Sequence, residues 1–253
     1  MESPMQPHDN IRRELAAYLL PLLDLTSLND DDTSARIEAL CLRARACAIQ
    51  PAAVCVYPAH VAAARRALAG TAVKIASVVN FPDGGSDVAR VTREIETVIA
   101  AGADEIDAVL SWAAFVRGDV TTARTVVDAA RTACGTRVLK LILETGELGT
   151  PVRIRDAAQL GIDARVDFLK TSTGKAAVNA TPEAAAIMLD VIAANRGRCG
   201  FKAAGGIRSL DAAIEFLDLA RARLGDEWIA PEQFRIGASA LFEELAALVA
   251  PSR

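Results

Sequence analysis

Four charged residues lie within short apolar segments of the sequence, where a charge is costly to bury. Asp107, Lys140 and Lys202 have apolar neighbours on both sides, and Lys170 follows Leu169. An ionised side chain costs several kcal/mol to bury unless it is paired. These residues therefore indicate either a neutralised structural network or an active site.

Two lysines held close together would supply a reactive amine. At about 5 Å and an effective dielectric constant of about 20, two ammonium groups repel by about 3 kcal/mol, which lowers one pKa by about 2 from its usual value near 10.4. A neutral amine attacks a carbonyl group and forms a Schiff base, whose iminium accepts electrons while the adjacent C–C bond is made or broken. Asp107 could move the protons that this reaction needs, and no metal is required.

The elements that must position these residues follow one repeated pattern. A short apolar run, a turn and a helical pattern of about 10 to 15 residues recur from Leu22 to Gly237, which is typical of βαβ units. Eight such units in 253 residues predict a closed, parallel (β/α)8 TIM barrel, with a doubly wound open sheet as the alternative. The expected strands are Leu22–Thr26, Val54–Tyr57, Lys74–Val79, Glu105–Val109, Val138–Leu143, Phe168–Thr171, Gly200–Ala203 and Phe234–Gly237.

The segments between the strands carry helix-start signals, and nothing divides the chain. Thr150-Pro151 and Thr181-Pro182 each place a capping hydroxyl before a proline at the first helical position. Ile11–Leu20 is expected to form an extra helix before the first strand, covering the barrel floor. We expect a single catalytic domain over residues 11–250, preceded by a disordered tail of residues 1–10.

The alternation of residues along each strand predicts where the charged side chains point. Leu139 and Leu141 must face the helices, so Lys140 points into the barrel. The same alternation sends a further set inward: Glu105, Asp107, Lys170 and Lys202. Lys170 and Lys202 then lie at the C-terminal ends of adjacent strands, where barrel enzymes place their chemistry. For any single Lys–Asp pair, a purely structural role remains the alternative.

Three glycine-containing loops follow strands at this same end of the predicted barrel. Glycines let backbone N–H groups approach an anion, and barrels commonly bind phosphate with the loops after strands seven and eight. The loops therefore predict a monophosphate site, although Lys175 and Arg208 could instead be solvated surface cations. The loops are Thr171-Ser172-Thr173-Gly174-Lys175, Ala204-Gly205-Gly206-Ile207-Arg208 and Gly237-Ala238-Ser239.

Composition excludes several classes of protein. The chain has 28 basic and 32 acidic residues and lacks a basic stripe, which argues against nucleic-acid binding. Five cysteines without a C-x-x-C motif argue against zinc and dithiol sites. There is neither a signal-peptide pattern at the start nor an apolar run of membrane-spanning length, so we expect a cytoplasmic protein with no membrane partner.

These motifs resemble those of class I deoxyribose-phosphate aldolase in its longer bacterial form. The resemblance runs from about Asp24 to Leu241, and its most specific part is the run from Phe168 to Lys175. It implies reversible cleavage of 2-deoxy-D-ribose 5-phosphate into D-glyceraldehyde 3-phosphate and acetaldehyde, in deoxynucleoside breakdown. It implies no cofactor, and a homodimer is plausible on the resemblance alone.

The resemblance also implies residue roles. Lys170 would form the Schiff base, Lys202 would tune it, Asp107 would relay protons, and Asp24 would pair with or orient Lys202. Thr173 and Lys175 would also contact a sugar hydroxyl. The phosphate would be held by Gly174, Lys175, Gly205, Gly206, Gly237 and Ser239.

Several positions depart from the family pattern. Ala203 replaces a proline, Ala240 replaces a serine, and the chain ends at Arg253 without the tyrosine tail that assists proton exchange in some bacterial members. We expect these changes to affect substrate fit and proton exchange more than the lysine chemistry. Cys55 is interpreted as a small buried residue in preference to a reactive thiol.

Two other functions fit a barrel with these residues. One is a phosphosugar isomerase or epimerase, in which Asp107 abstracts a proton and the lysines stabilise an enolate. The other is a phosphate-ligand sensor without a nucleophile. Only the aldolase hypothesis requires a covalent bond between Lys170 and a carbonyl substrate.

Overall fold

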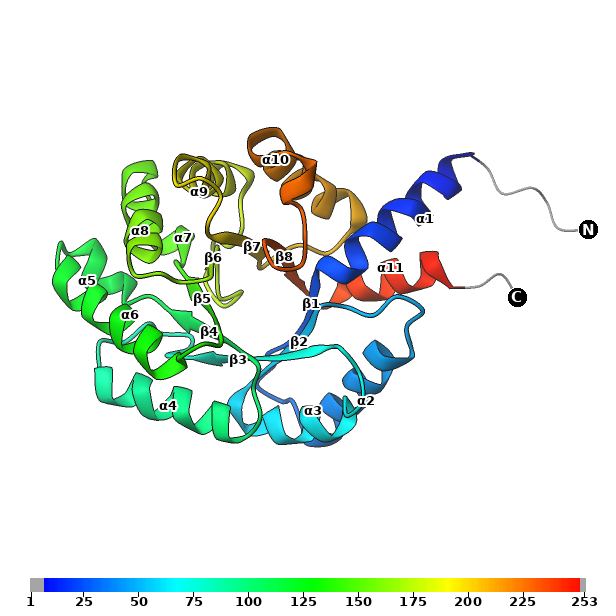
Figure 1. The fold of residues 1–253 in the computed structure, drawn as a ribbon, viewed down its shortest axis with the longest axis horizontal. Helices are drawn as coiled ribbons and strands as arrows, with labels where there is room; N and C mark the ends of the chain where they lie inside the picture. The colour runs from blue at the N-terminus through cyan, green and yellow to red at the C-terminus, as the bar shows by residue number, and fades with distance from the viewer. Residues whose placement is uncertain (1–6, 251–253) are drawn as a thin grey trace, which may run out of the picture.

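The computed structural model describes residues 7–250, which form a closed barrel of parallel strands surrounded by helices (Figure 1). Each strand pairs with the next one along the chain, and β1 also pairs with β8. This closure confirms the predicted (β/α)8 barrel and rules out the open sheet. The strands are β1 (Leu23–Ser27), β2 (Ala53–Val56), β3 (Lys74–Val79), β4 (Glu105–Val109), β5 (Val138–Ile142), β6 (Phe168–Lys170), β7 (Gly200–Ala204) and β8 (Phe234–Ala238).

The helices pack around the outside of the barrel. Thr150 and Thr181 cap α8 and α9 as predicted, because their side chains accept hydrogen bonds from the backbone N–H groups of Arg153 and Ala184. Within residues 7–250, no helix has both the length and the apolar character needed to cross a membrane. The α-helices are α1 (Pro7–Leu19), α2 (Ser34–Ala46), α3 (Val61–Ala67), α4 (Val88–Ala100), α5 (Trp112–Val116), α6 (Val120–Cys134), α7 (Thr145–Leu148), α8 (Pro151–Asp163), α9 (Pro182–Ala194), α10 (Leu210–Leu224) and α11 (Ala240–Val249), with short 3-10 turns at Leu20–Leu22, Pro58–His60 and Asp226–Trp228.

The main hydrophobic core lies between the strands and the helices. Leu139, Leu141 and Leu169 belong to this layer, which confirms that they face outward and that their neighbours in the strands face inward. The contact with α8 is close: a Cβ at Gly161 would lie 2.6 Å from Leu169 Cδ2. This packing fixes the inward direction of the alternate, charged residues.

The N-terminal segment differs from the prediction. Helix α1 begins at Pro7 and not at Ile11, so part of the expected disordered tail is helical, while residues 1–6 lie outside the described residues. Arg12 forms ion pairs with Asp211 of α10 and Glu244 of α11. Figure 1 shows α1 beside α11 at the edge of the barrel, and the two helices pack against each other.

Candidate active site

The barrel interior contains seven buried charged side chains, which we call the charge cluster. They come from six different strands because the inward positions of neighbouring strands converge on the barrel axis. The most exposed of them, Arg235, exposes 5% of its surface. The cluster comprises Asp24, Glu105, Asp107, Lys140, Lys170, Lys202 and Arg235.

Asp107 is the central acceptor of the charge cluster. Its Oδ2 accepts hydrogen bonds from Lys170 Nζ and Lys202 Nζ, each at 2.8 Å. Its Oδ1 accepts a bond from Lys140 Nζ, also at 2.8 Å. Because Lys170 and Lys202 share one oxygen, their amines are at most twice 2.8 Å, about 5.6 Å, apart. They are also register partners on adjacent strands.

Two further carboxylates complete the charge cluster. Asp24 accepts Lys202 Nζ at 2.5 Å and Arg235 Nη1 at 2.6 Å. Glu105 lies 2.6 Å from Lys140 Nζ and 3.2 Å from Arg235 Nη2. The sequence analysis missed Arg235, although its position between the outward residues Phe234 and Ile236 would have indicated an inward side chain.

The contacts fix the charge states of two key groups. Burial raises the pKa of Asp107, but the facing ammonium groups of Lys140, Lys170 and Lys202 outweigh burial and hold this pKa well below its usual value. Burial lowers the pKa of Lys202, but Asp107 and Asp24 outweigh it and raise this pKa above its usual value. Lys202 is therefore an ammonium group and Asp107 a carboxylate at neutral pH.

This arrangement corrects the expectation of direct repulsion between two lysines. The amines of Lys170 and Lys202 are as close as expected, but Asp107 bridges them and Asp24 also binds Lys202. An intervening carboxylate offsets most of the repulsion between its two neighbours. Repulsion between the two lysines alone therefore does not explain a reactive amine, and the charge of the whole cluster must be considered.

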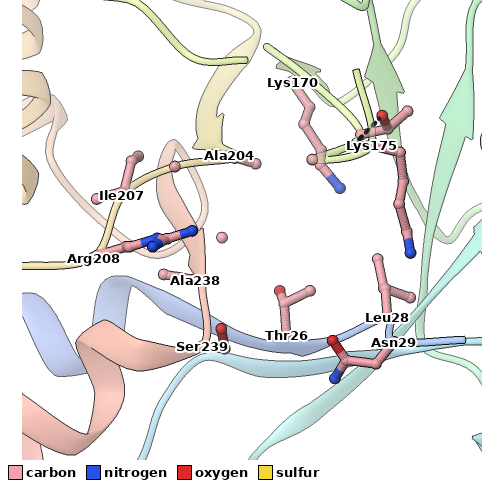
Figure 2. Close-up of a pocket in the computed structure, with 15 residues that line it drawn as sticks. Thr26, Leu28, Asn29, Lys170, Lys175, Ala204, Ile207, Arg208, Ala238 and Ser239 are labelled. Carbon is pink, nitrogen blue, oxygen red and sulfur yellow. Dashed lines mark hydrogen bonds between the residues drawn. The ribbon is translucent and has the colours of Figure 1, made fainter. Parts of the chain in front are cut away.

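A cavity of about 300 Å³, which we call the mouth cavity, opens at the C-terminal ends of the strands. Lys170 is the member of the charge cluster that lines it. Figure 2 shows Lys170, Lys175 and Arg208 on different sides of this space, with Thr26 and Ser239 facing Lys170 across it. The lining includes all eight residues predicted to bind the substrate or its phosphate: Thr173, Gly174, Lys175, Gly205, Gly206, Arg208, Gly237 and Ser239.

Glycine relieves close contacts at two positions around the mouth cavity. Gly205 has a φ of +91°, and a Cβ there would lie 2.8 Å from Asn179 Cβ. At Gly237, a Cβ would lie 3.0 Å from Lys202 Cε. The first glycine permits a left-handed turn in the cavity lining, and the second leaves room for the Lys202 side chain beneath the loop.

Glu144 is a buried carboxyl group that the sequence analysis missed. It follows β5 and adopts a left-handed backbone conformation, with a φ of 55°. Its Oε2 accepts a hydrogen bond of 2.5 Å from the Thr173 hydroxyl, and burial raises its pKa. Glu144 and Thr173 line a second cavity of about 170 Å³, which we call the side cavity. An acidic residue directly after a barrel strand was the available signal.

Cys55 lies inside the barrel beside the charge cluster. Its Sγ is 4.0 Å from Asp107 Oδ2, and the residue is fully buried. It packs with Leu28, Ala76 and Val78 in a small inner apolar group. Burial raises the pKa of this thiol, which keeps it protonated at neutral pH and fits its interpretation as a packing residue.

Comparison with known proteins gives one family match. A model of the family described as DeoC/LacD family aldolase matches residues 18–241, which include the whole charge cluster and the lining of the mouth cavity. Within the described residues, no group of three or more His, Cys, Asp or Glu side chains is placed to hold a metal ion.

Solved structures of similar proteins share the barrel. A protein from Coccidioides immitis, provisionally described as a deoxyribose-phosphate aldolase, has 28% identity and a TM-score of 0.79, covering 90% of this chain and 86% of its own. A similarly described protein from Toxoplasma gondii ME49 has 24% identity and a TM-score of 0.87, covering 95% and 96%. The deoxyribose phosphate aldolase from Aeropyrum pernix has 23% identity and a TM-score of 0.73, covering 97% and 100%. At these identities, the last two show the fold alone.

Proposed function

The chain belongs to the DeoC/LacD family of aldolases, and from this premise we propose that it reversibly cleaves 2-deoxy-D-ribose 5-phosphate into D-glyceraldehyde 3-phosphate and acetaldehyde. The reaction proceeds through a Schiff base at Lys170 and serves deoxynucleoside breakdown. One observation carries the proposal: the amine of Lys170 reaches from a buried charge cluster into a cavity whose rim is made of glycine loops suited to a phosphate.

The net charge and the placement of the cluster support an amine nucleophile at the mouth cavity. The cluster contains four basic groups and three carboxylates, so it carries one excess positive charge when every group is ionised. Uncompensated charge is costly in a buried site. Lys170 alone among the cluster's cations lines the mouth cavity, so its amine is placed to act as the nucleophile that meets the substrate.

The proposed reaction uses the groups around this amine. Lys170 Nζ attacks the aldehyde carbon of the open-chain sugar, and loss of water gives an iminium. A base removes the proton of the C3 hydroxyl, the C2–C3 bond breaks, and its electron pair moves into the iminium to form an enamine. Protonation of the enamine carbon and hydrolysis then release acetaldehyde. Asp107, 2.8 Å from Lys170 Nζ, moves these protons directly or through water.

The mouth cavity suits the other end of the substrate. Arg208 and Lys175 supply positive charge, and the loops that contain Gly205 and Gly237 supply backbone N–H groups. A phosphate bound there places the intervening sugar carbons between the loops and Lys170. The proposal therefore assigns the glycine loops to substrate binding and the charge cluster to chemistry.

The decisive test is to trap the covalent intermediate. We expect acetaldehyde and borohydride to add an ethyl group to Lys170, because reduction of the iminium leaves a stable secondary amine. Peptide mass spectrometry locates the label, and turnover of 2-deoxy-D-ribose 5-phosphate is measured in parallel. Labelling confined to another lysine would move the Schiff base to that residue, and turnover without any label would favour an isomerase or an epimerase.

A second prediction concerns the pH dependence of activity. Lys202→Leu removes a cation, so the cluster becomes neutral only when Lys170 keeps its proton. The removed charge lies within about 5.6 Å of the Lys170 amine. Its loss changes the electrostatic energy of the charged amine by up to about 3 kcal/mol at an effective dielectric constant of about 20. We therefore expect the rise of kcat/KM with pH to move upward by at least about one pH unit. A profile that stays in place would remove Lys202 from this role.

A further inference from the structure

Thr173 lines both the mouth cavity and the side cavity, as does Lys175. It exposes only 6% of its surface and lies on the loop that joins Lys170 to Gly174. In the proposed reaction this loop runs alongside the middle of the substrate, between the reacting carbon and the phosphate. The hydrogen bonds already made by Thr173 therefore limit what its hydroxyl can offer to a substrate.

The Thr173 hydroxyl has one donor and two acceptor positions. Its hydrogen is donated to Glu144 Oε2 at 2.5 Å. One acceptor position is used by the backbone N–H of Lys175, at 3.0 Å. The hydroxyl is left with a single lone pair, so towards the mouth cavity it can accept a hydrogen bond but cannot donate one.

Glu144 is held in the position that enforces this direction. Its oxygens also accept the backbone N–H of Thr173, at 3.3 and 3.4 Å. Its left-handed backbone conformation is uncommon for a residue with a side chain and persists only where surrounding contacts impose it. The Glu144 carboxylate thus accepts hydrogen bonds from both the backbone N–H and the hydroxyl of Thr173. Because a charged acceptor forms a stronger hydrogen bond than a neutral one, a neutral substrate group does not displace it from the Thr173 hydroxyl.

We propose that Glu144 is a positioning residue that sets the hydrogen-bond direction of Thr173, so that the site selects aldehydes with a hydroxyl group on the carbon next to the carbonyl. The inference rests on the proposed function. The substrate hydroxyl donates to Thr173, whereas a group at the same carbon that can only accept a hydrogen bond finds no donor on the Thr173 hydroxyl. Glu144 acts on selectivity through Thr173 and does not itself contact the substrate.

The test uses three acceptor aldehydes in the synthetic direction, each condensed with acetaldehyde. They are D-glyceraldehyde 3-phosphate, 3-oxopropyl phosphate, which lacks the hydroxyl, and 2-fluoro-3-oxopropyl phosphate, whose fluorine accepts but cannot donate. Comparing wild type with Thr173→Val for each aldehyde cancels the intrinsic reactivity of the aldehydes. We expect the substitution to lower kcat/KM for the hydroxyl aldehyde at least about tenfold more than for the other two.

Variants of Glu144 test the indirect role. Glu144→Gln keeps an oxygen that can accept the Thr173 hydrogen, so we expect it to keep the preference for the hydroxyl aldehyde. Glu144→Met has a similar length but no such acceptor and should lose that preference by the same factor as Thr173→Val. Adding Glu144→Met to Thr173→Val should not reduce the preference further, because both changes remove the same interaction.

Three results would overturn the inference. The first is that Thr173→Val lowers kcat/KM equally for the fluoro and hydroxyl aldehydes. The second is that Glu144→Met keeps the preference for the hydroxyl aldehyde. The third is that the two substitutions have additive effects on this preference in the double variant. Labelling of Lys170 by acetaldehyde and borohydride checks the fold of each variant. If Glu144→Met does not fold, the fluoro comparison in Thr173→Val still decides the hydrogen-bond direction. Failure of the wild type to condense D-glyceraldehyde 3-phosphate would instead refute the proposed function.

Discussion

Lys170→Ala is expected to lower kcat/KM for 2-deoxy-D-ribose 5-phosphate at least about 1,000-fold, because it removes the proposed Schiff-base nucleophile. The barrel should stay folded. Without Lys170, the charge cluster keeps three basic groups and three carboxylates and is therefore balanced. Asp107 also keeps its bonds to Lys140 and Lys202. Steady-state kinetics and circular dichroism measure the two effects separately.

Lys175→Ala provides the matched control for this variant. Lys175 lines the same mouth cavity, but its amine contacts the exposed Asp30 at 3.0 Å and lies outside the charge cluster. We expect this variant to raise KM through weaker phosphate binding and to retain acetaldehyde labelling at Lys170. Substantial activity in purified Lys170→Ala would reassign the nucleophile, and lost labelling in Lys175→Ala would show that the two lysines are not separable.

Asp107→Asn should have the largest effect on stability. The substitution removes a carboxylate that accepts hydrogen bonds from three buried lysines, and the cluster then carries two excess positive charges when fully ionised. Breaking a buried ion pair by removing one partner costs about 3–5 kcal/mol of unfolding free energy. Activity should fall as well, because the proton relay next to Lys170 is lost. Urea denaturation at pH 7 measures the first effect.

The pH dependence of this loss follows from the sign of the pKa shift. The pKa of Asp107 is depressed in the folded protein, so its contribution to stability is fully present above the unfolded pKa of about 3.9 and is lost as the pH falls through the folded value. The difference in the free energy of unfolding between wild type and Asp107→Asn should therefore be largest near neutral pH. It should become smaller below about pH 3.9.

Asp128→Asn is the control for the stability measurement. Asp128 pairs with Arg124 on the surface of α6, with half of its side chain exposed. Exposed ion pairs contribute about 0–1 kcal/mol to the free energy of unfolding, so Asp128→Asn should change this free energy little. A similar loss in both variants would contradict a special role for the buried cluster.

The fold was predictable because its determinants are local and repeated. Alternation within strands such as Leu139-Lys140-Leu141 indicates both the strand and the inward direction of its charge, and eight repeats of one pattern favour closure of the sheet. The start of α1 was less predictable. Pro7 begins this helix within a polar segment, and its contacts with α10 and α11 involve residues about 200 positions away.

The placement of the candidate site residues was predictable from the sequence, but their electrostatics were not. The alternation of residues along each strand, together with the spacing of the motifs, predicts that Lys170, Lys202 and Asp107 lie at one end of the barrel. They do not reveal that one oxygen of Asp107 lies between both amines, since that depends on side-chain geometry across three strands. Glu144 was missed for the same reason, because its importance comes from the Thr173 hydroxyl 29 positions away.

The burial of the charge cluster beneath the mouth loops separates two engineering problems. The rim that we propose binds the phosphate can be redesigned for unphosphorylated aldehydes without changing the buried charges, since the two groups of side chains meet mainly at Lys170. Gly237 is the exception, because any larger residue there would press on Lys202 Cε. A library built on the rim should leave Gly237 untouched for this reason, and Gly205 untouched because of its positive φ and its contact with Asn179.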